Sequence, residues 1–101
     1  LPTGVARLVE VARALAVRPS LLLLDEPAAG LDAEETERFA ALLRDLAADG
    51  TAVVLVEHDM ALVMDVCDDL HVLDLGKIIA VGPPEAVKRD ETVLAAYLGD
   101  A

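Results

Sequence analysis

The sequence has almost no aromatic side chains. It contains one phenylalanine, one tyrosine and no tryptophan, although 55% of its residues are apolar. The core must therefore be built from leucine, valine and alanine, which is typical of layered α/β domains. Cysteine is nearly absent as well, because Cys67 stands alone. A lone cysteine excludes an internal disulfide framework and is typical of proteins from a reducing compartment.

Basic residues are scarce. Eight lysines and arginines face 19 acidic residues, which gives a net charge of −11. This excess of negative charge argues against a surface for nucleic acid or for an anionic membrane. No apolar run approaches the roughly 20 residues that a membrane-spanning helix needs, and no signal-peptide pattern is visible.

Two further features are missing. The 101 residues contain no Gly-x-x-x-x-Gly-Lys-Ser/Thr segment, the glycine-rich loop whose amides and lysine hold phosphates. They also begin with Leu1 rather than methionine, within what looks like a motif. The length allows one small domain at most, and we expect the chain to be part of a longer protein.

Four consecutive leucines at positions 21–24 are the most apolar stretch of the chain. They predict a strand that is buried on both faces of a parallel sheet. The strand ends on Asp25 and Glu26, and in open α/β sheets ligands bind at the carboxyl ends of the strands. Two adjacent carboxylates at that edge can hold a divalent cation and a base beside a phosphate.

The next segment predicts a helix over residues 32–49. Asp32 is the expected N-cap, with Glu35 as its capping-box partner, and Gly50 is a typical residue after a helix end. Seen in this way, Asp32 needs no role beyond capping, although capping does not prevent a second role.

A second strand, expected over residues 51–57 and again buried on both faces, ends on Glu57-His58-Asp59. The carboxyl ends of parallel strands meet at one edge of a sheet, so we expect His58 to lie beside Asp25 and Glu26. An imidazole there can donate a hydrogen bond to a terminal phosphate. We interpret Glu57 as a simple polar strand end and Asp59 as the cap of a short helix.

The last third of the chain predicts a β-hairpin over residues 68–81, with a tight turn at Leu75-Gly76. His71 and the aspartates around it suggest a metal site, but in a strand His71 and Asp74 point to opposite faces. We therefore favour exposed strand polarity. Two helices follow: a short one that begins at a proline and runs through Val87, and a last one over residues 91–98 that Gly99 ends.

The first residues, Leu1-Pro2-Thr3-Gly4-Val5, open a predicted helix that runs to about Val17. Thr3 is its expected N-cap. Apolar residues follow one helical stripe, and small residues at the start leave free N–H groups and a positive dipole end for an anion.

The segment around Asp25-Glu26 resembles the Walker B motif of P-loop ATPases, and with its surroundings it resembles the ATP-binding subunit of an ABC transporter. The resemblance implies that Asp25 holds Mg2+, usually through water, and that Glu26 is the general base that polarises the attacking water. Residues 29–32 are similar to the family's D-loop, which crosses the dimer interface. His58 is similar to the H-loop histidine, which donates to the γ-phosphate.

Residues 1–5 stand where the family has its signature sequence, Leu-Ser-Gly-Gly-Gln. Leu1 and Gly4 match, whereas Pro2 replaces the serine that contacts the γ-phosphate of ATP on the opposite subunit, and Val5 replaces the glutamine. Pro2 has neither a hydroxyl nor an N–H, so that contact is not carried over; Thr3 offers a substitute hydroxyl. By resemblance, Leu1, Thr3, Gly4 and Asp32 complete the ATP site across the dimer interface.

The resemblance covers essentially all 101 residues. It implies an α/β fold, namely a partial P-loop NTPase (ABC ATPase) fold. The expected parts are parallel strands with flanking helices, a C-terminal β-hairpin and short helices. Residues 1–101 would then be the C-terminal half of the domain. It also implies ATP and Mg2+ as cofactors, with a second ATP-binding subunit and membrane-spanning subunits as partners. The expected location is cytoplasmic, at the inner face of the cell membrane. The first helix and the last segment are similar to the branched-chain amino-acid transporters of the family.

The missing phosphate loop has a structural consequence. In the family's sheet its strand lies between the strand before His58 and the strand over residues 70–74. Without it we expect unpaired strand edges and exposed apolar faces, and hence a chain that is either marginally stable or repairs its sheet by self-association. We also expect that this chain alone neither binds ATP tightly nor hydrolyses it.

Two other interpretations stay open. The missing loop and the changes at Pro2 and Val5 suggest a non-catalytic module of the same ancestry, used for oligomerisation or partner docking. A small metal-dependent hydrolase that uses Asp25 and Glu26 is disfavoured, because the sequence supplies no oxyanion donors and too few ligands.

Overall fold

The computed structural model describes residues 3–98, and the side chains of residues 4–97. The chain divides into two compact units, Leu1–Leu62 and Val63–Ala101, and the boundary falls within one helix. Among the described residues no helix has both the length and the apolar character to cross a membrane.

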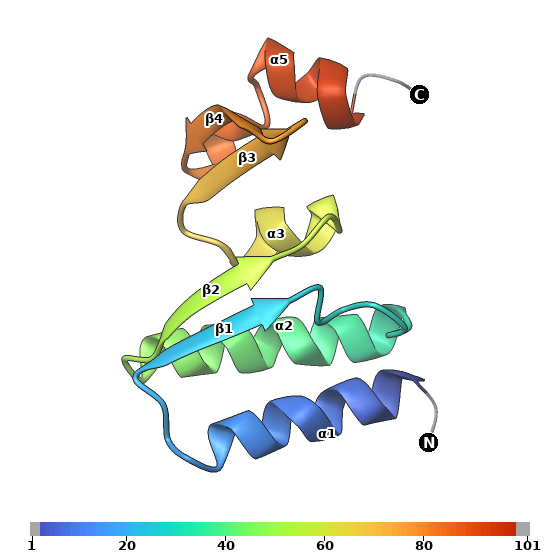
Figure 1. The fold of residues 1–101 in the computed structure, drawn as a ribbon, viewed down its shortest axis with the longest axis vertical. Helices are drawn as coiled ribbons and strands as arrows, with labels where there is room; N and C mark the ends of the chain where they lie inside the picture. Colours follow the sequence, from blue (N-terminus) through green and yellow to red (C-terminus); the bar gives the residue numbers. More distant parts are fainter. Residues whose placement is uncertain (1–2, 99–101) are drawn as a thin grey trace. The chain divides into compact units, whose positions relative to one another are not determined.

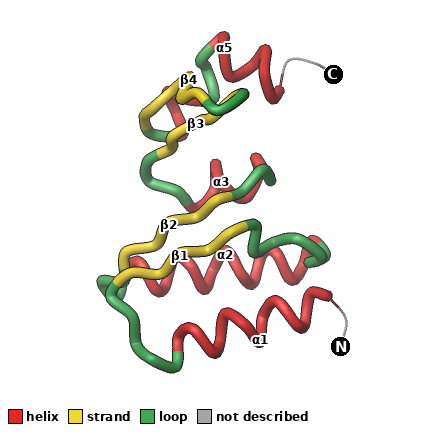
Figure 2. The backbone as a smooth tube through the Cα atoms, in the orientation of Figure 1, coloured by secondary structure: helices red, strands yellow, loops and turns green. Residues whose placement is uncertain are grey.

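The first unit is built on two parallel strands and two long helices (Figure 1). Strands β1 and β2 pair in register from Leu21↔Ala52 to Asp25↔Val56, as expected for a β-α-β unit. Helix α2 packs along the strand pair and α1 lies near β1 (Figures 1 and 2). Its elements are α1 (Thr3–Leu15), β1 (Leu21–Asp25), α2 (Ala33–Ala48), β2 (Ala52–Val56) and the start of α3 (Met60–Val66).

The predicted burial of both strands on both faces is wrong. Residues alternate along each strand, and only the face that carries Leu22 is covered by helices. Leu22 is 4% exposed, whereas its neighbour Leu23 is 67% exposed. Within the first unit the second face is largely open, so its apolar side chains remain accessible. They are Leu21, Leu23, Val54 and Val56.

Helix α2 begins as its sequence predicts. The Asp32 carboxylate accepts a hydrogen bond from the Glu35 N–H at 2.8 Å, and the Glu35 carboxylate accepts one from the Asp32 N–H at 3.0 Å. This capping box satisfies two N–H groups that a helix start leaves free. At the other end Gly50 has a φ of +96°, the left-handed conformation that glycine adopts without strain.

The second unit contains an antiparallel hairpin and short helices. Strands β3 (Leu70–Asp74) and β4 (Lys77–Gly82) are joined by the expected turn, in which Leu75 and Gly76 both have positive φ. Its core is formed by apolar side chains of the hairpin and helices. Buried residues here include Val63, Leu70, Val87 and Val93. The two strand pairs are separate sheets, so β2 has no partner on its second edge within the described residues.

Several helix ends differ from the prediction. Helix α1 begins at Thr3 and ends at Leu15, so Thr3 is not its N-cap. Helix α4 covers Pro84–Val87 as expected. The last helix is α only over Glu91–Val93 (α5) and continues as a π-helical turn over Leu94–Leu98. In that turn the Tyr97 hydroxyl donates to the carbonyl of Leu73. The predicted stop at Gly99 lies outside the described residues.

Candidate functional site

The carboxyl ends of β1 and β2 bring an acid and an imidazole together. Nε2 of His58 lies 2.7 Å from Oε1 of Glu26, a hydrogen-bond distance. The two residues are 32 positions apart in the sequence, but Glu26 directly follows β1 and His58 is the second residue after β2. Side-chain exposure is 76% for His58 and 49% for Glu26, so the pair is open to solvent and to a ligand.

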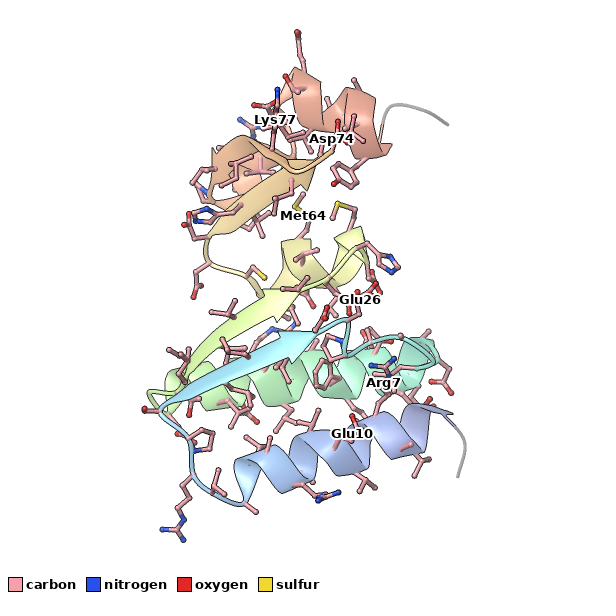
Figure 3. All side chains as sticks on the ribbon, viewed as in Figure 1. Arg7, Glu10, Glu26, Met64, Asp74 and Lys77 are labelled. Atoms are coloured by element: carbon pink, nitrogen blue, oxygen red, sulfur yellow. The ribbon has the colours of Figure 1, made fainter. Side chains whose placement is uncertain are left out.

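Backbone geometry at the end of β1 turns Glu26 toward this edge. Glu26 has a φ of +47°, which is uncommon for a residue other than glycine. Its N–H donates to the carbonyl of Val56 at 2.7 Å and extends the strand ladder by one bond. Its carbonyl then accepts from the Ala29 N–H at 3.2 Å, which closes a turn. Figure 3 shows Glu26 where this turn leaves β1.

Asp25 lies on the exposed side of β1 and lines a shallow hollow of about 160 Å³. Arg7 and Glu10 of α1 line the same hollow (Figure 3). The described residues include no group of three or more side chains that could hold a metal ion by themselves. Mg2+ usually takes only one or two carboxylates in a protein and fills its shell with water and phosphate oxygens. Asp25 therefore fits a magnesium nucleotide as a single protein ligand.

The start of α1 packs tightly against the loop before α2. A Cβ added to Gly4 would lie 3.0 Å from the carbonyl oxygen of Gly30 and 3.2 Å from Leu31 and Glu35 atoms. Only glycine fits this approach without displacing its neighbours. The contact brings Gly4 to the segment that carries Asp32, whose carboxylate is engaged in the capping box. Leu1 lies outside the described residues, as does the side chain of Thr3.

One polar residue at this edge was underestimated from the sequence. The Glu57 carboxylate accepts a hydrogen bond from the Ala28 N–H at 3.0 Å and from the His58 N–H at 3.1 Å. Glu57 is half-buried and follows the half-buried residues Val53 and Leu55 at intervals of two. That spacing places it on the covered face, where a carboxylate needs donors. The sequence shows this alternation but not which face is covered, so the bonds of Glu57 could not be predicted from it.

Comparisons with known proteins find relatives along the whole chain. A family model described as "Branched-chain amino acid ATP-binding cassette transporter" matches residues 77–101. The chain is 43% identical to the high-affinity branched-chain amino acid transport ATP-binding protein BraF of Pseudomonas aeruginosa, over 100% of this chain and 40% of that protein. It is 42% identical to the lipopolysaccharide export system ATP-binding protein LptB of Haemophilus influenzae, over 99% of this chain and 42% of that protein.

Two solved structures show the same fold over nearly the whole chain. An ATP-binding cassette of an ABC transporter in its ADP conformation aligns with a TM-score of 0.84 at 32% identity, over 99% of this chain and 41% of its own. A nucleotide-free ATP-binding cassette aligns with a TM-score of 0.85 at 31% identity, over 99% and 41%. The chain belongs to the ATP-binding cassette family. It spans about 40% of the length of the curated relatives that it matches.

Within the ABC fold, the edge at β1 and β2 brings together the three residues that the motifs assign to magnesium and catalysis. Asp25 and Glu26 leave β1, His58 follows β2, and Glu26 and His58 are in contact. Gly4 and the loop before Asp32 form a second, adjoining contact within the same unit. His71 takes no part in either: it is exposed on β3, 3.6 Å from an Asp69 oxygen, in keeping with the interpretation of exposed strand polarity.

Proposed function

We propose that this chain is the C-terminal part of the ATP-binding subunit of an ABC transporter, in which ATP hydrolysis drives transport across a membrane. The observation that carries the proposal is the 2.7 Å contact between Glu26 and His58 at the end of the paired strands, beside Asp25. ABC membership supports it, since ATP-binding subunits are the relatives matched over the whole chain.

The proposed chemistry is phosphoryl transfer to water. Mg2+, when bound, neutralises charge that develops on the phosphates. Asp25 would contribute a carboxylate to it, Glu26 would take a proton from the attacking water, and His58 would donate a hydrogen bond to the γ-phosphate. The contact at 2.7 Å shows that one hydrogen bond can join Glu26 and His58, so each can orient the other.

The proposed partners follow from the same family. Leu1, Thr3, Gly4 and Asp32 would contact ATP held by a second ATP-binding subunit, and membrane-spanning subunits would bind the dimer at the cytoplasmic face. Branched-chain amino acids are the proposed cargo, because residues 77–101 match a model of that branch. The sequence identity to LptB is similar to that to BraF, which makes lipopolysaccharide the alternative cargo.

The decisive experiment replaces Glu26 in a protein that contains this chain together with a phosphate loop. Glu26→Gln keeps the size of the side chain but removes the base, so ATP turnover should fall by about 10² to 10⁴-fold while ATP affinity is retained. Glu37→Gln, the same change at an exposed position of α2, is the matched control. Unchanged turnover in the Glu26 variant would exclude the base role.

A non-catalytic module is the second candidate, because Pro2 and Val5 stand where the family's signature sequence has serine and glutamine. Calorimetry with Mg-ATP tests whether this chain alone binds the nucleotide. We expect no binding in the micromolar range, because the amides and lysine that hold phosphates are missing. Micromolar affinity would show that the chain carries a phosphate site of its own. We also propose that the chain alone self-associates through its exposed strands.

A further inference from the structure

The carboxylate of Glu57 joins two loops that are far apart in the sequence. Oε2 accepts a hydrogen bond from the Ala28 N–H at 3.0 Å, across a separation of 29 residues. Oε1 accepts from the His58 N–H at 3.1 Å and, at 3.4 Å, from the Asp59 N–H. Each oxygen therefore serves a different loop. Bonds from amides to an ionised carboxylate are stronger than those between neutral groups.

These bonds fix the turn that presents Glu26. Ala28 lies two residues after Glu26, in the turn that the bond from Ala29 to the Glu26 carbonyl closes. On the other side, the Glu26 N–H donates to Val56, which directly precedes Glu57. Two hydrogen bonds accepted by adjacent residues, Val56 at the end of β2 and Glu57 directly after it, thus hold both ends of the Glu26 turn.

The Glu26–His58 contact needs such support. Ion pairs between exposed side chains contribute little by themselves, because solvent screens them and fixing long side chains costs entropy. Glu26 also has a φ of +47°, a conformation that persists only where the surrounding structure imposes it. Glu57 bonds both to the turn of Glu26 and to the backbone of His58.

We propose that Glu57 is a positioning residue that sets the Glu26–His58 geometry by binding the amides of both loops. It does not face the reacting atoms, since its two oxygens are occupied by backbone N–H groups. The importance of this role for ATP hydrolysis rests on the proposed function. The geometric role itself does not, and it can be tested separately in the 101-residue chain.

The test measures coupling between side chains by NMR. Glu57→Gln keeps the shape but leaves only one acceptor oxygen, so one loop must lose its bond. We first record how Glu26→Gln changes the ring 1H and 15N shifts of His58 in the otherwise unmodified chain. The same change is then made in the Glu57→Gln background. We expect the response of the His58 ring to fall by more than half there.

Glu37→Gln provides the control background, in which the His58 response should be unaltered. An equal His58 response in the Glu57→Gln and Glu37→Gln backgrounds overturns the proposal. Mere loss of stability would not produce the expected pattern, because the folded fraction would retain the full response. Chain folding is monitored in the same spectra.

A second measurement covers the case in which Glu57→Gln fails to fold. In the unmodified chain the Ala28 amide should exchange with solvent at least about tenfold more slowly than in an unstructured peptide, because it is bonded to Glu57. Exchange at the unprotected rate overturns the proposal. Loss of turnover in Glu26→Gln together with an unprotected Ala28 amide would leave the proposed function intact and remove only the role of Glu57.

Discussion

At the level of single residues, the candidate site depends on backbone positions that few side chains tolerate. Glu26 leaves β1 in the left-handed region, and Gly4 lets α1 approach the loop before α2. In both cases the local conformation is unfavourable or restrictive by itself and is maintained by neighbours. Substitution at such positions should therefore affect stability as well as the site.

Gly4→Ala tests the close approach of α1. In an open helix alanine is more favourable than glycine by about 1 kcal/mol. Here the added Cβ would lie 3.0 Å from the Gly30 carbonyl oxygen, so the backbone must move. We expect a net loss of about 1–2 kcal/mol in the free energy of unfolding, measured with urea. Ala12→Gly, at an exposed position of the same helix, should also destabilise, through propensity alone. A more stable Gly4→Ala variant would contradict the observed packing.

The pKa of Cys67 predicts how the stability of the chain depends on pH. Burial, and to a smaller extent the neighbouring Asp68 carboxylate, raise the pKa of the Cys67 thiol above its ordinary value. The Cys67 thiol of the folded chain therefore keeps its proton at a pH where the same thiol of the unfolded chain has lost it. The stability from this group is present below the unfolded pKa and is lost as the pH rises through the folded pKa.

Alkylation with iodoacetamide measures this pKa directly. Between pH 8 and pH 9 the native chain should react more slowly than the chain unfolded in urea, because the thiolate is the nucleophile. Asp68→Asn should recover part of the alkylation rate, because it removes the negative charge beside the thiol but leaves the thiol buried. Equal rates in the native and unfolded chains at each pH would show that the thiol is not perturbed.

At the level of elements, each strand of the first unit has one covered and one open face. Leu22 and Leu23 are adjacent in the sequence and chemically identical, but they differ in exposure from 4% to 67%. Leu22→Ala should therefore cost about 2–4 kcal/mol of unfolding free energy, and Leu23→Ala less than about 1 kcal/mol. Urea unfolding of both variants at one low protein concentration is the measurement. Similar losses would mean that the second face is covered in solution.

Elements were predictable where short-range patterns decide them. The strand at the four leucines, the capping box of Asp32 and Glu35 and the turn at Leu75-Gly76 depend on residues within a few positions, and the structure confirms all three. The meeting of Glu26 and His58 followed from strand topology. Coverage of the strand faces depends on packing between distant segments, so four leucines alone could not reveal it. The bond of Glu57 to Ala28 spans 29 residues and was missed for the same reason.

At the level of the whole molecule, exposed apolar surface and net charge have opposite effects on self-association. The open face of β1 and β2 presents Leu21, Leu23, Val54 and Val56, and β2 has a free edge within the described residues. Such surfaces favour association with another chain. The net charge of −11 works against association of identical chains, and salt screens that repulsion.

Sedimentation velocity at several protein concentrations and two salt concentrations separates these effects. We expect concentration-dependent self-association that strengthens with salt, because screening weakens the repulsion while the apolar contact remains. Leu23→Lys should weaken the association by about tenfold or more, since a charge would have to be buried against apolar surface. Val17→Lys is the matched control: Val17 is an apolar residue that is 78% exposed and lies outside the strands, so its replacement should leave the strand contact intact. If the unmodified chain remained monomeric at every concentration and melted sharply at a temperature independent of concentration, the open face would not be an association surface.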